Sequence, residues 1–120
     1  MKILMIDDEE DIRKVGLLSL ERVGKFAVRQ AASASEGLAV AREDPPDVIL
    51  LDVIMPGMDG PQTLMELRKD PALQSIPVIF LTAKVQPQDV ERYLGLGALG
   101  VIQKPFDPMS LPAQIRKILG

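Results

Sequence analysis

The sequence contains no cysteine, no histidine and no tryptophan, and its aromatic residues are limited to one tyrosine and three phenylalanines. Without cysteine and histidine, the chain cannot form disulfide scaffolds, thiolate or imidazole zinc sites, cysteine nucleophiles or histidine-based catalytic triads. A metal site in this chain must therefore use oxygen ligands, which suit hard cations such as Mg²⁺. The scarcity of aromatic residues predicts an aliphatic core.

An excess of positive charge is also lacking. The chain has 14 lysines and arginines against 17 aspartates and glutamates, a net charge of -3, so nothing indicates direct nucleic-acid binding. The apolar run before Asp7 is too short for a signal peptide or a membrane span, and we expect a cytoplasmic protein without a membrane partner. A length of 120 residues, with 47% hydrophobic and 26% charged residues, fits a single domain over residues 1–120.

Strand-like segments recur along the chain. Unbroken apolar runs at 3–6, 48–51 and 78–81 predict strands that are buried on both faces. The segment 26–31 alternates apolar and polar residues, and the segment 101–102 is short, so both are expected at the edges of a sheet.

Helix-like segments separate these strands. Ser33 and Glu36 have the spacing of a capping box, so a helix should start there and run to about Asp44. The other segments expected to be helical, from the spacing of their apolar residues, are 12–23 with Gly24 as a stop, a short stretch around 64–67, 87–94 and 111–119.

Five β/α units in series indicate a doubly wound α/β domain, in which a five-stranded parallel sheet carries helices on both faces. The connections between parallel strands are right-handed, which leaves few topologies. With the second and fifth strands at the edges, the strand order 2-1-3-4-5 is favoured, which is the flavodoxin-like order.

Charged or hydroxyl side chains follow four of the predicted strands. Asp7 and Asp8 follow the first strand, Asp52 ends the third, Thr82 ends the fourth and Lys104 follows the fifth. Because ligands of open α/β sheets bind beyond the carboxyl ends of the strands, these side chains are expected to gather at one site.

This combination of residue types suits phosphoryl transfer. Carboxylates held close together repel one another, and Mg²⁺ relieves the repulsion while it also binds phosphate oxygens. Lys104 adds a second positive charge, and the Thr82 hydroxyl can donate a hydrogen bond. One carboxylate is then free to attack phosphorus and form an aspartyl phosphate.

Each residue also has a purely structural interpretation. The acidic run 7–11 is compatible with a solvated helix start, and Asp52 with a loop cap. Thr82 is compatible with a simple strand end, and Lys104 with an ordinary surface lysine. Their joint occurrence at the ends of neighbouring strands favours the phosphoryl-transfer site.

Four segments of the chain resemble response regulator receiver domains of two-component signal transduction, the chemotaxis-Y-like family. They are Ile3-Leu4-Met5-Ile6-Asp7-Asp8-Glu9, 51–60, Leu81-Thr82-Ala83 and Gln103-Lys104-Pro105-Phe106. The resemblance implies a receiver, rather than an enzyme with an external substrate, that catalyses its own aspartyl phosphorylation and dephosphorylation. Its implied partners are a sensor histidine kinase or phosphotransfer protein, and an output protein or domain of unknown identity.

The resemblance also assigns roles around the metal. Asp52 resembles the phosphoacceptor and one of the Mg²⁺ ligands. Asp8 resembles a direct Mg²⁺ ligand, and Asp7 a helper that acts largely through water. The backbone carbonyl of Ile54 resembles the third protein ligand.

On the phosphoryl side, Thr82 and Lys104 resemble the residues that contact the transferred group. Receivers usually hold the peptide bond before the proline of the Lys-Pro pair in the cis form, so Lys104–Pro105 is expected to be cis. The chain departs from the family at Val101, where receivers usually carry an aromatic residue that acts as a switch. Since valine is small and stiff at χ1, we expect this face to respond by loop and helix displacement within 83–100.

Three other interpretations compete with this one. An aspartyl phosphatase of the dehalogenase-like family would need a second aspartate two residues after Asp52, where this chain has Ile54. A flavodoxin-type flavin module would need a loop rich in serine, threonine and glycine where the acidic run 7–11 lies. A degenerate receiver that binds partners independently of phosphorylation stays as the alternative, although the complete set of acidic, threonine and lysine residues argues against it.

Overall fold

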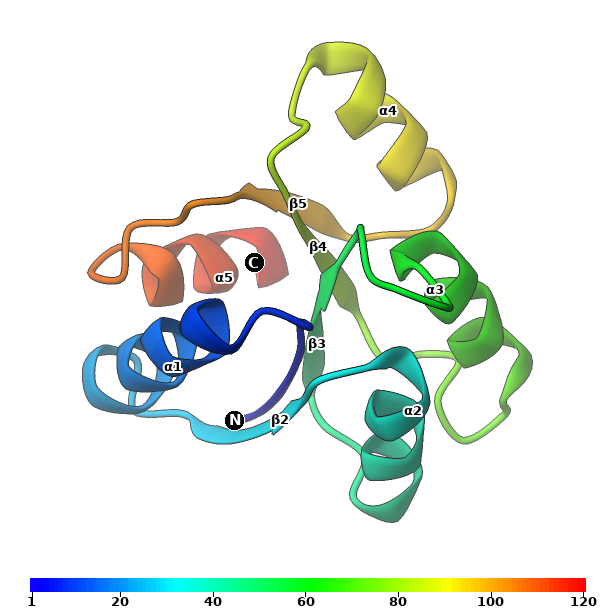
Figure 1. Cartoon of the computed structure of the whole chain (residues 1–120), viewed down its shortest axis with the longest axis horizontal. Helices are drawn as coiled ribbons and strands as arrows, with labels where there is room; N and C mark the ends of the chain where they lie inside the picture. The colour runs from blue at the N-terminus through cyan, green and yellow to red at the C-terminus, as the bar shows by residue number, and fades with distance from the viewer.

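The apolar runs form a parallel sheet, in agreement with the predicted fold class. The computed structural model describes all residues from 1 to 120, and its arrangement is shown in Figure 1. The strands are β1 (Lys2–Ile6), β2 (Ala27–Ala31), β3 (Val48–Asp52), β4 (Val78–Thr82) and β5 (Gly100–Gln103). All neighbouring strands are parallel, in the order β2-β1-β3-β4-β5. The alternating and the short segments therefore lie at the two edges, as the sequence predicted.

Helices cover both faces of this sheet (Figure 1). They are α1 (Glu10–Leu18), a π-helical segment η1 (Ser19–Val23), α2 (Ala34–Glu43), α3 (Gly60–Lys69), α4 (Pro87–Gly95) and α5 (Leu111–Leu119). α1 and α5 lie on one face, whereas α2, α3 and α4 lie on the other. None of these helices has the length and apolar character needed to span a membrane.

The core is divided into two apolar layers by the sheet. Successive side chains of a strand point to opposite faces, so Leu4 and Ile6 pack with α2, α3 and α4, whereas Ile3 and Met5 pack on the side of α1 and α5. Burial on both faces explains why β1, β3 and β4 are almost continuously apolar.

Short polar side chains cap the starts of α2 and α3. The Ser33 hydroxyl accepts a hydrogen bond from the Glu36 N–H at 3.2 Å, which confirms the expected start of α2. Asp59 forms a complete capping box with Gln62 at the start of α3, a motif that the sequence analysis did not identify. A capping box satisfies backbone donors that the first helical turn leaves free.

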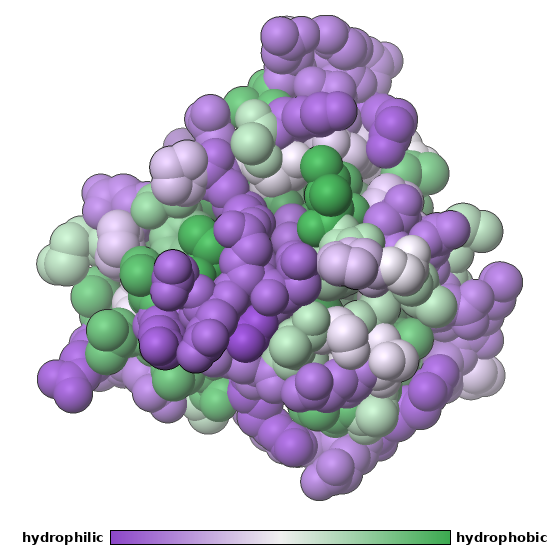
Figure 2. All heavy atoms as spheres, in the orientation of Figure 1, coloured by the Kyte–Doolittle hydropathy of each residue, from purple (hydrophilic) through white to green (hydrophobic).

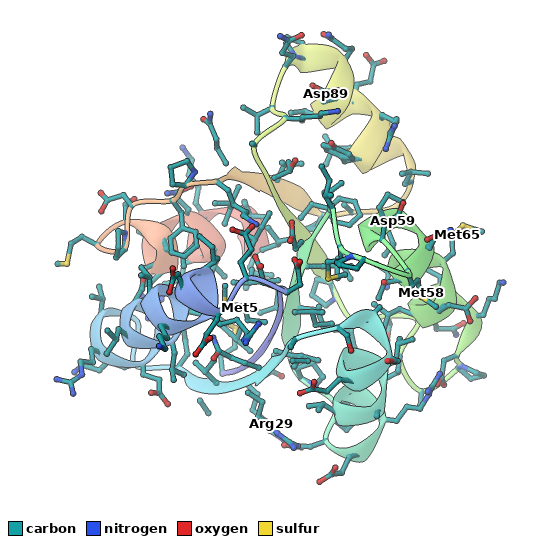
Figure 3. All side chains as sticks on the ribbon, in the orientation of Figure 1. Met5, Arg29, Met58, Asp59, Met65 and Asp89 are labelled. Carbon is teal, nitrogen blue, oxygen red and sulfur yellow. The ribbon has the colours of Figure 1, made fainter.

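The segment 12–23 is helical and ends before Gly24, as predicted, but the apolar residues that predicted it do not form its buried face. It changes from α1 to the π-helical η1 at Ser19, and its residues Val15, Leu18 and Val23 are all more than a third exposed. The helix instead approaches the sheet through Gly16, where a Cβ atom would come within 2.6 Å of the sulfur of Met5, which is labelled in Figure 3. The apolar residues of this segment therefore do not identify its buried face, and the helical period changes from Ser19 onward.

Candidate functional site

The residues that follow the strands meet at the carboxyl edge of the sheet. Asp7, Asp52 and Thr82 are buried there, and Lys104 approaches from the loop after β5. In the view of Figure 2, hydrophilic side chains gather in the middle of the molecule, among the ends of the central strands in Figure 1. Side chains separated by up to 97 positions thus come into contact.

Lys104 is the centre of the ionic contacts at this edge. Its Nζ atom lies 3.1 Å from Asp7 Oδ2, 2.9 Å from Glu9 Oε1 and 3.3 Å from Asp52 Oδ1. The Lys104 N–H donates to the Thr82 carbonyl oxygen at 2.9 Å, which fixes the loop to the end of β4. The following peptide bond, Lys104–Pro105, is cis, the form expected from the resemblance.

The two buried carboxylates are difficult to ionise. Burial, followed by the negative charge of Asp7, raises the pKa of Asp52 from 3.8 to about 7, against the opposing effect of Lys104. Burial also raises the pKa of Asp7, although the Glu9 N–H and Lys104 oppose the shift. Burial alone would lower the pKa of Lys104, but hydrogen bonds to Glu9 and Asp7 outweigh it, so the net shift is upward. Lys104 therefore remains charged and offsets only part of the carboxylate repulsion.

A bound hard cation would offset the remaining repulsion between the carboxylates. Oxygen atoms of Asp7, Asp8, Glu9 and Asp52 all lie within 4.8 Å of one another. The Oδ2 atom of Asp52 is buried and has no hydrogen-bond partner, although buried polar atoms are normally satisfied. An all-oxygen set of this kind fits Mg²⁺, and an acidic cluster at this place is typical of the Mg²⁺ site of receivers.

The remaining predicted site residues line a hollow at this edge of the sheet. It is bounded by residues that include Asp8, Asp52, Ile54, Thr82 and Lys104. The Ile54 N–H lies 3.4 Å from Asp52 Oδ1, and the Ile54 side chain is exposed. The Thr82 hydroxyl accepts a hydrogen bond from the Lys84 N–H at 3.1 Å, which orients its oxygen beside the hollow.

Glu9 is a contributor that sequence reasoning did not single out. Its carboxylate makes the shortest contact with Lys104, and its N–H donates to Asp7 Oδ1 at 2.9 Å. The acidic run 7–11 contained the signal, but the spacing alone did not show which of its carboxylates turns toward Lys104.

Val101 lies near the site without belonging to it. It is half-buried and packs against the apolar layer of α2, α3 and α4, on the β5 strand that precedes Lys104. Its role as a switch position stays a prediction.

Comparison with known proteins gives a family for this site. The family model described as the response regulator receiver domain matches residues 3–116. Response regulator Rre1 of Synechocystis sp. is 37% identical over 119 residues, which are 99% of this chain and 52% of that protein. The probable transcriptional regulator ycf27 of Guillardia theta is 40% identical over 118 residues, 98% of this chain and 45% of that protein. The chain thus spans about half the length of these relatives.

Solved structures with the same fold include other receivers. The chemotaxis response regulator CheY4 of Vibrio cholerae superposes with a TM-score of 0.90 at 32% identity, covering 98% of this chain and 97% of that one. The signal receiver domain of a signal transduction histidine kinase from Syntrophus aciditrophicus gives a TM-score of 0.83 at 32% identity, with 98% and 89% coverage. With a family match over nearly its whole length and an acidic pocket at the carboxyl edge of its sheet, the chain belongs to the response regulator receiver domain family.

Proposed function

We propose that residues 1–120 form one receiver unit that takes a phosphoryl group onto Asp52 with the help of Mg²⁺. The donor would be a sensor histidine kinase or a phosphotransfer protein. The observation that carries the proposal is the Asp52 carboxylate, which ends a buried strand with one oxygen held by Lys104 and the other without a partner. A carboxylate that is fixed in place and incompletely satisfied is suited to act as a nucleophile.

In the proposed step, a carboxylate oxygen of Asp52 forms a bond to phosphorus. The P–N bond of a phosphohistidine breaks at the same time, and the imidazole leaves with the electron pair. Lys104 stabilises negative charge on the phosphoryl oxygens, since its Nζ atom lies 3.3 Å from Asp52 Oδ1. Thr82 offers a hydroxyl at the rim of the same hollow, from which it can donate to a phosphoryl oxygen.

Asp8, Asp52 and the backbone carbonyl of Ile54 would hold the Mg²⁺ ion, and Asp7 would support it through water. When bound, the cation neutralises charge on the carboxylates and on the phosphoryl oxygens. The ionised form of Asp52, which is the nucleophile, is then favoured at neutral pH in spite of its burial.

Acetyl phosphate tests the proposal directly, because its P–O bond breaks in the equivalent step and acetate leaves. We expect wild-type protein with Mg²⁺ to gain the mass of one phosphate, and Asp52→Asn to gain none. Asp11→Asn removes an exposed carboxylate outside the cluster and should be labelled like the wild type. Equal labelling of Asp52→Asn would show that another residue accepts the phosphate.

The output is proposed from the relatives. Several similar proteins are named transcriptional regulators and are about twice as long as the matched region. We therefore propose that the phosphorylated receiver acts on an output domain or protein, without contacting nucleic acid itself. If no wild-type labelling occurs, phosphorylation-independent binding of such a partner becomes the better explanation.

A further inference from the structure

α4 is attached to the body of the domain by a single buried side chain. Tyr93 is the only buried residue of this helix, whereas α2 and α3 each bury a full stripe of residues. Figure 1 shows α4 standing apart from the other helices at the top of the view. A helix with so little buried surface has a low free energy of displacement compared with the rest of the fold.

Tyr93 connects α4 to strand β4 and to the segment that follows Asp52. Its ring meets Phe80 of β4 edge to face, with a centroid distance of 5.4 Å and an angle of 71°. It also lines a hollow of about 350 Å³ together with Val53, Ile54 and Met55. These three residues directly follow Asp52, so the ring lies against the segment that a phosphoryl group on Asp52 would perturb.

Phe80 and the end of β3 approach each other on either side of one small residue. Between them lies Gly60, at the start of α3, where a Cβ atom would come within 2.7 Å of the Asp52 carbonyl oxygen and 3.2 Å of the Phe80 ring. The space beside Gly60 has no room for a side chain, so the end of β3, Gly60 and the Phe80 ring are neighbours in a densely packed interior. This arrangement offers a route by which a displacement at the end of β3 reaches Phe80 and the Tyr93 ring.

The two ends of α4 are held differently. At the carboxyl end, Arg68 of α3 donates to the Gly97 carbonyl oxygen at 3.3 Å. At the amino end, Gln86 caps the helix without a side-chain hydrogen bond, and the preceding loop is tied to Thr82 through the Lys84 N–H at 3.1 Å. The amino end is thus the freer one, and its tether is the hydroxyl that is proposed to turn toward phosphate.

We infer that Tyr93 is the positioning residue that couples the state of the Asp52 site to the orientation of α4. The inference rests on the proposed function and adds to it the element that moves. Val101 pairs with Phe80 on the adjacent strand and packs against the same apolar layer, but it has no ring with which to make the edge-to-face contact. The aromatic contact with β4 is therefore made by a ring on α4. We infer that the helix that carries this ring is displaced as a unit.

The chain offers a direct probe, because Tyr93 is its only tyrosine and it has no tryptophan. Near-ultraviolet circular dichroism and tyrosine fluorescence then report on this one ring. We expect both signals to change when Mg²⁺ and beryllofluoride, a phosphoryl mimic, are added together to the full chain, and to stay constant with either alone. The amide exchange of residues 87–99 should change at least about fivefold in parallel, the lower range of allosteric coupling.

Substitutions separate coupling from simple packing. Tyr93→Phe keeps the edge-to-face contact and should preserve the exchange response of α4. Tyr93→Leu keeps an apolar anchor without a ring and should reduce the response to less than about twofold, while acetyl phosphate still labels Asp52. Leu94→Ala removes an exposed neighbour on the same helix and should leave the response unchanged.

The outcomes distinguish the inference from the function on which it rests. An unchanged tyrosine signal in wild-type protein that mass spectrometry shows to be phosphorylated would overturn the inference alone. A full α4 response in Tyr93→Leu would overturn it as well. Failure of wild-type protein to take up phosphate would instead overturn the proposed function.

Discussion

Asp52→Asn should stabilise the metal-free domain, because the substitution removes a charge that the fold buries at a cost. The Asp52 side chain is only 5% exposed, and its pKa is raised from 3.8 to about 7. Each pKa unit corresponds to about 1.4 kcal/mol, so ionisation of Asp52 costs the folded state about 4 kcal/mol at neutral pH. The new amide brings donors near Lys104 that find no partner, which returns about 2 kcal/mol of this gain. We expect a net increase of about 2 kcal/mol in the free energy of unfolding.

The same reasoning fixes the pH dependence of the wild type. From about pH 4 to about pH 7 the folded state keeps the Asp52 proton that the unfolded chain has lost, since the folded pKa is the higher one. The stability of the metal-free wild type should therefore decrease as the pH rises through this window and then level off. The raised pKa of Asp7 acts in the same direction.

Urea denaturation followed by far-ultraviolet circular dichroism, in the presence of a chelator at pH 5 and pH 8, measures both effects. The difference between wild type and Asp52→Asn should be larger at pH 8 than at pH 5. Asp11→Asn, which removes an exposed carboxylate, should follow the wild type at both values. If Asp52→Asn is no more stable than the wild type at pH 8, the carboxylate is not under the electrostatic stress that the geometry indicates.

Other expected outcomes concern the metal, the close packing and the switch. Millimolar Mg²⁺ should raise the melting temperature of the wild type, and Asp8→Ala should lose most of this shift. The metal-free form of Asp8→Ala should be at least as stable as the metal-free wild type. An equal shift in both proteins would show that the metal binds elsewhere. Gly60→Ala should destabilise the fold by about 1–3 kcal/mol in urea denaturation, since its Cβ meets the backbone of β3. Methyl NMR of Val101 should show the same χ1 rotamer with and without beryllofluoride, and a rotamer change would refute displacement of loop and helix as the response.

The acidic cluster illustrates how a site can be recognised before its contacts are known. Asp7, Asp52, Thr82 and Lys104 could be assigned to one place because parallel strands carry their carboxyl ends to the same edge. The three carboxylates that form ion pairs with Lys104 could not be assigned in this way. It depends on side-chain rotamers and on the depth of each group below the surface, which the order of residues along the chain does not specify.

The sequence by itself determined the α/β class, the two edge strands and most residues of the pocket, because these follow from local patterns of apolar residues and from the direction of parallel strands. Only the tertiary structure decided which apolar side chains are buried. In 12–23 the apolar residues have near-helical spacing, yet α1 approaches Met5 through Gly16 and leaves Val15 and Leu18 exposed. In α4 one tyrosine became the anchor of a whole helix. Burial of a side chain depends on what packs against it from distant parts of the chain, and that is settled only when the layers assemble.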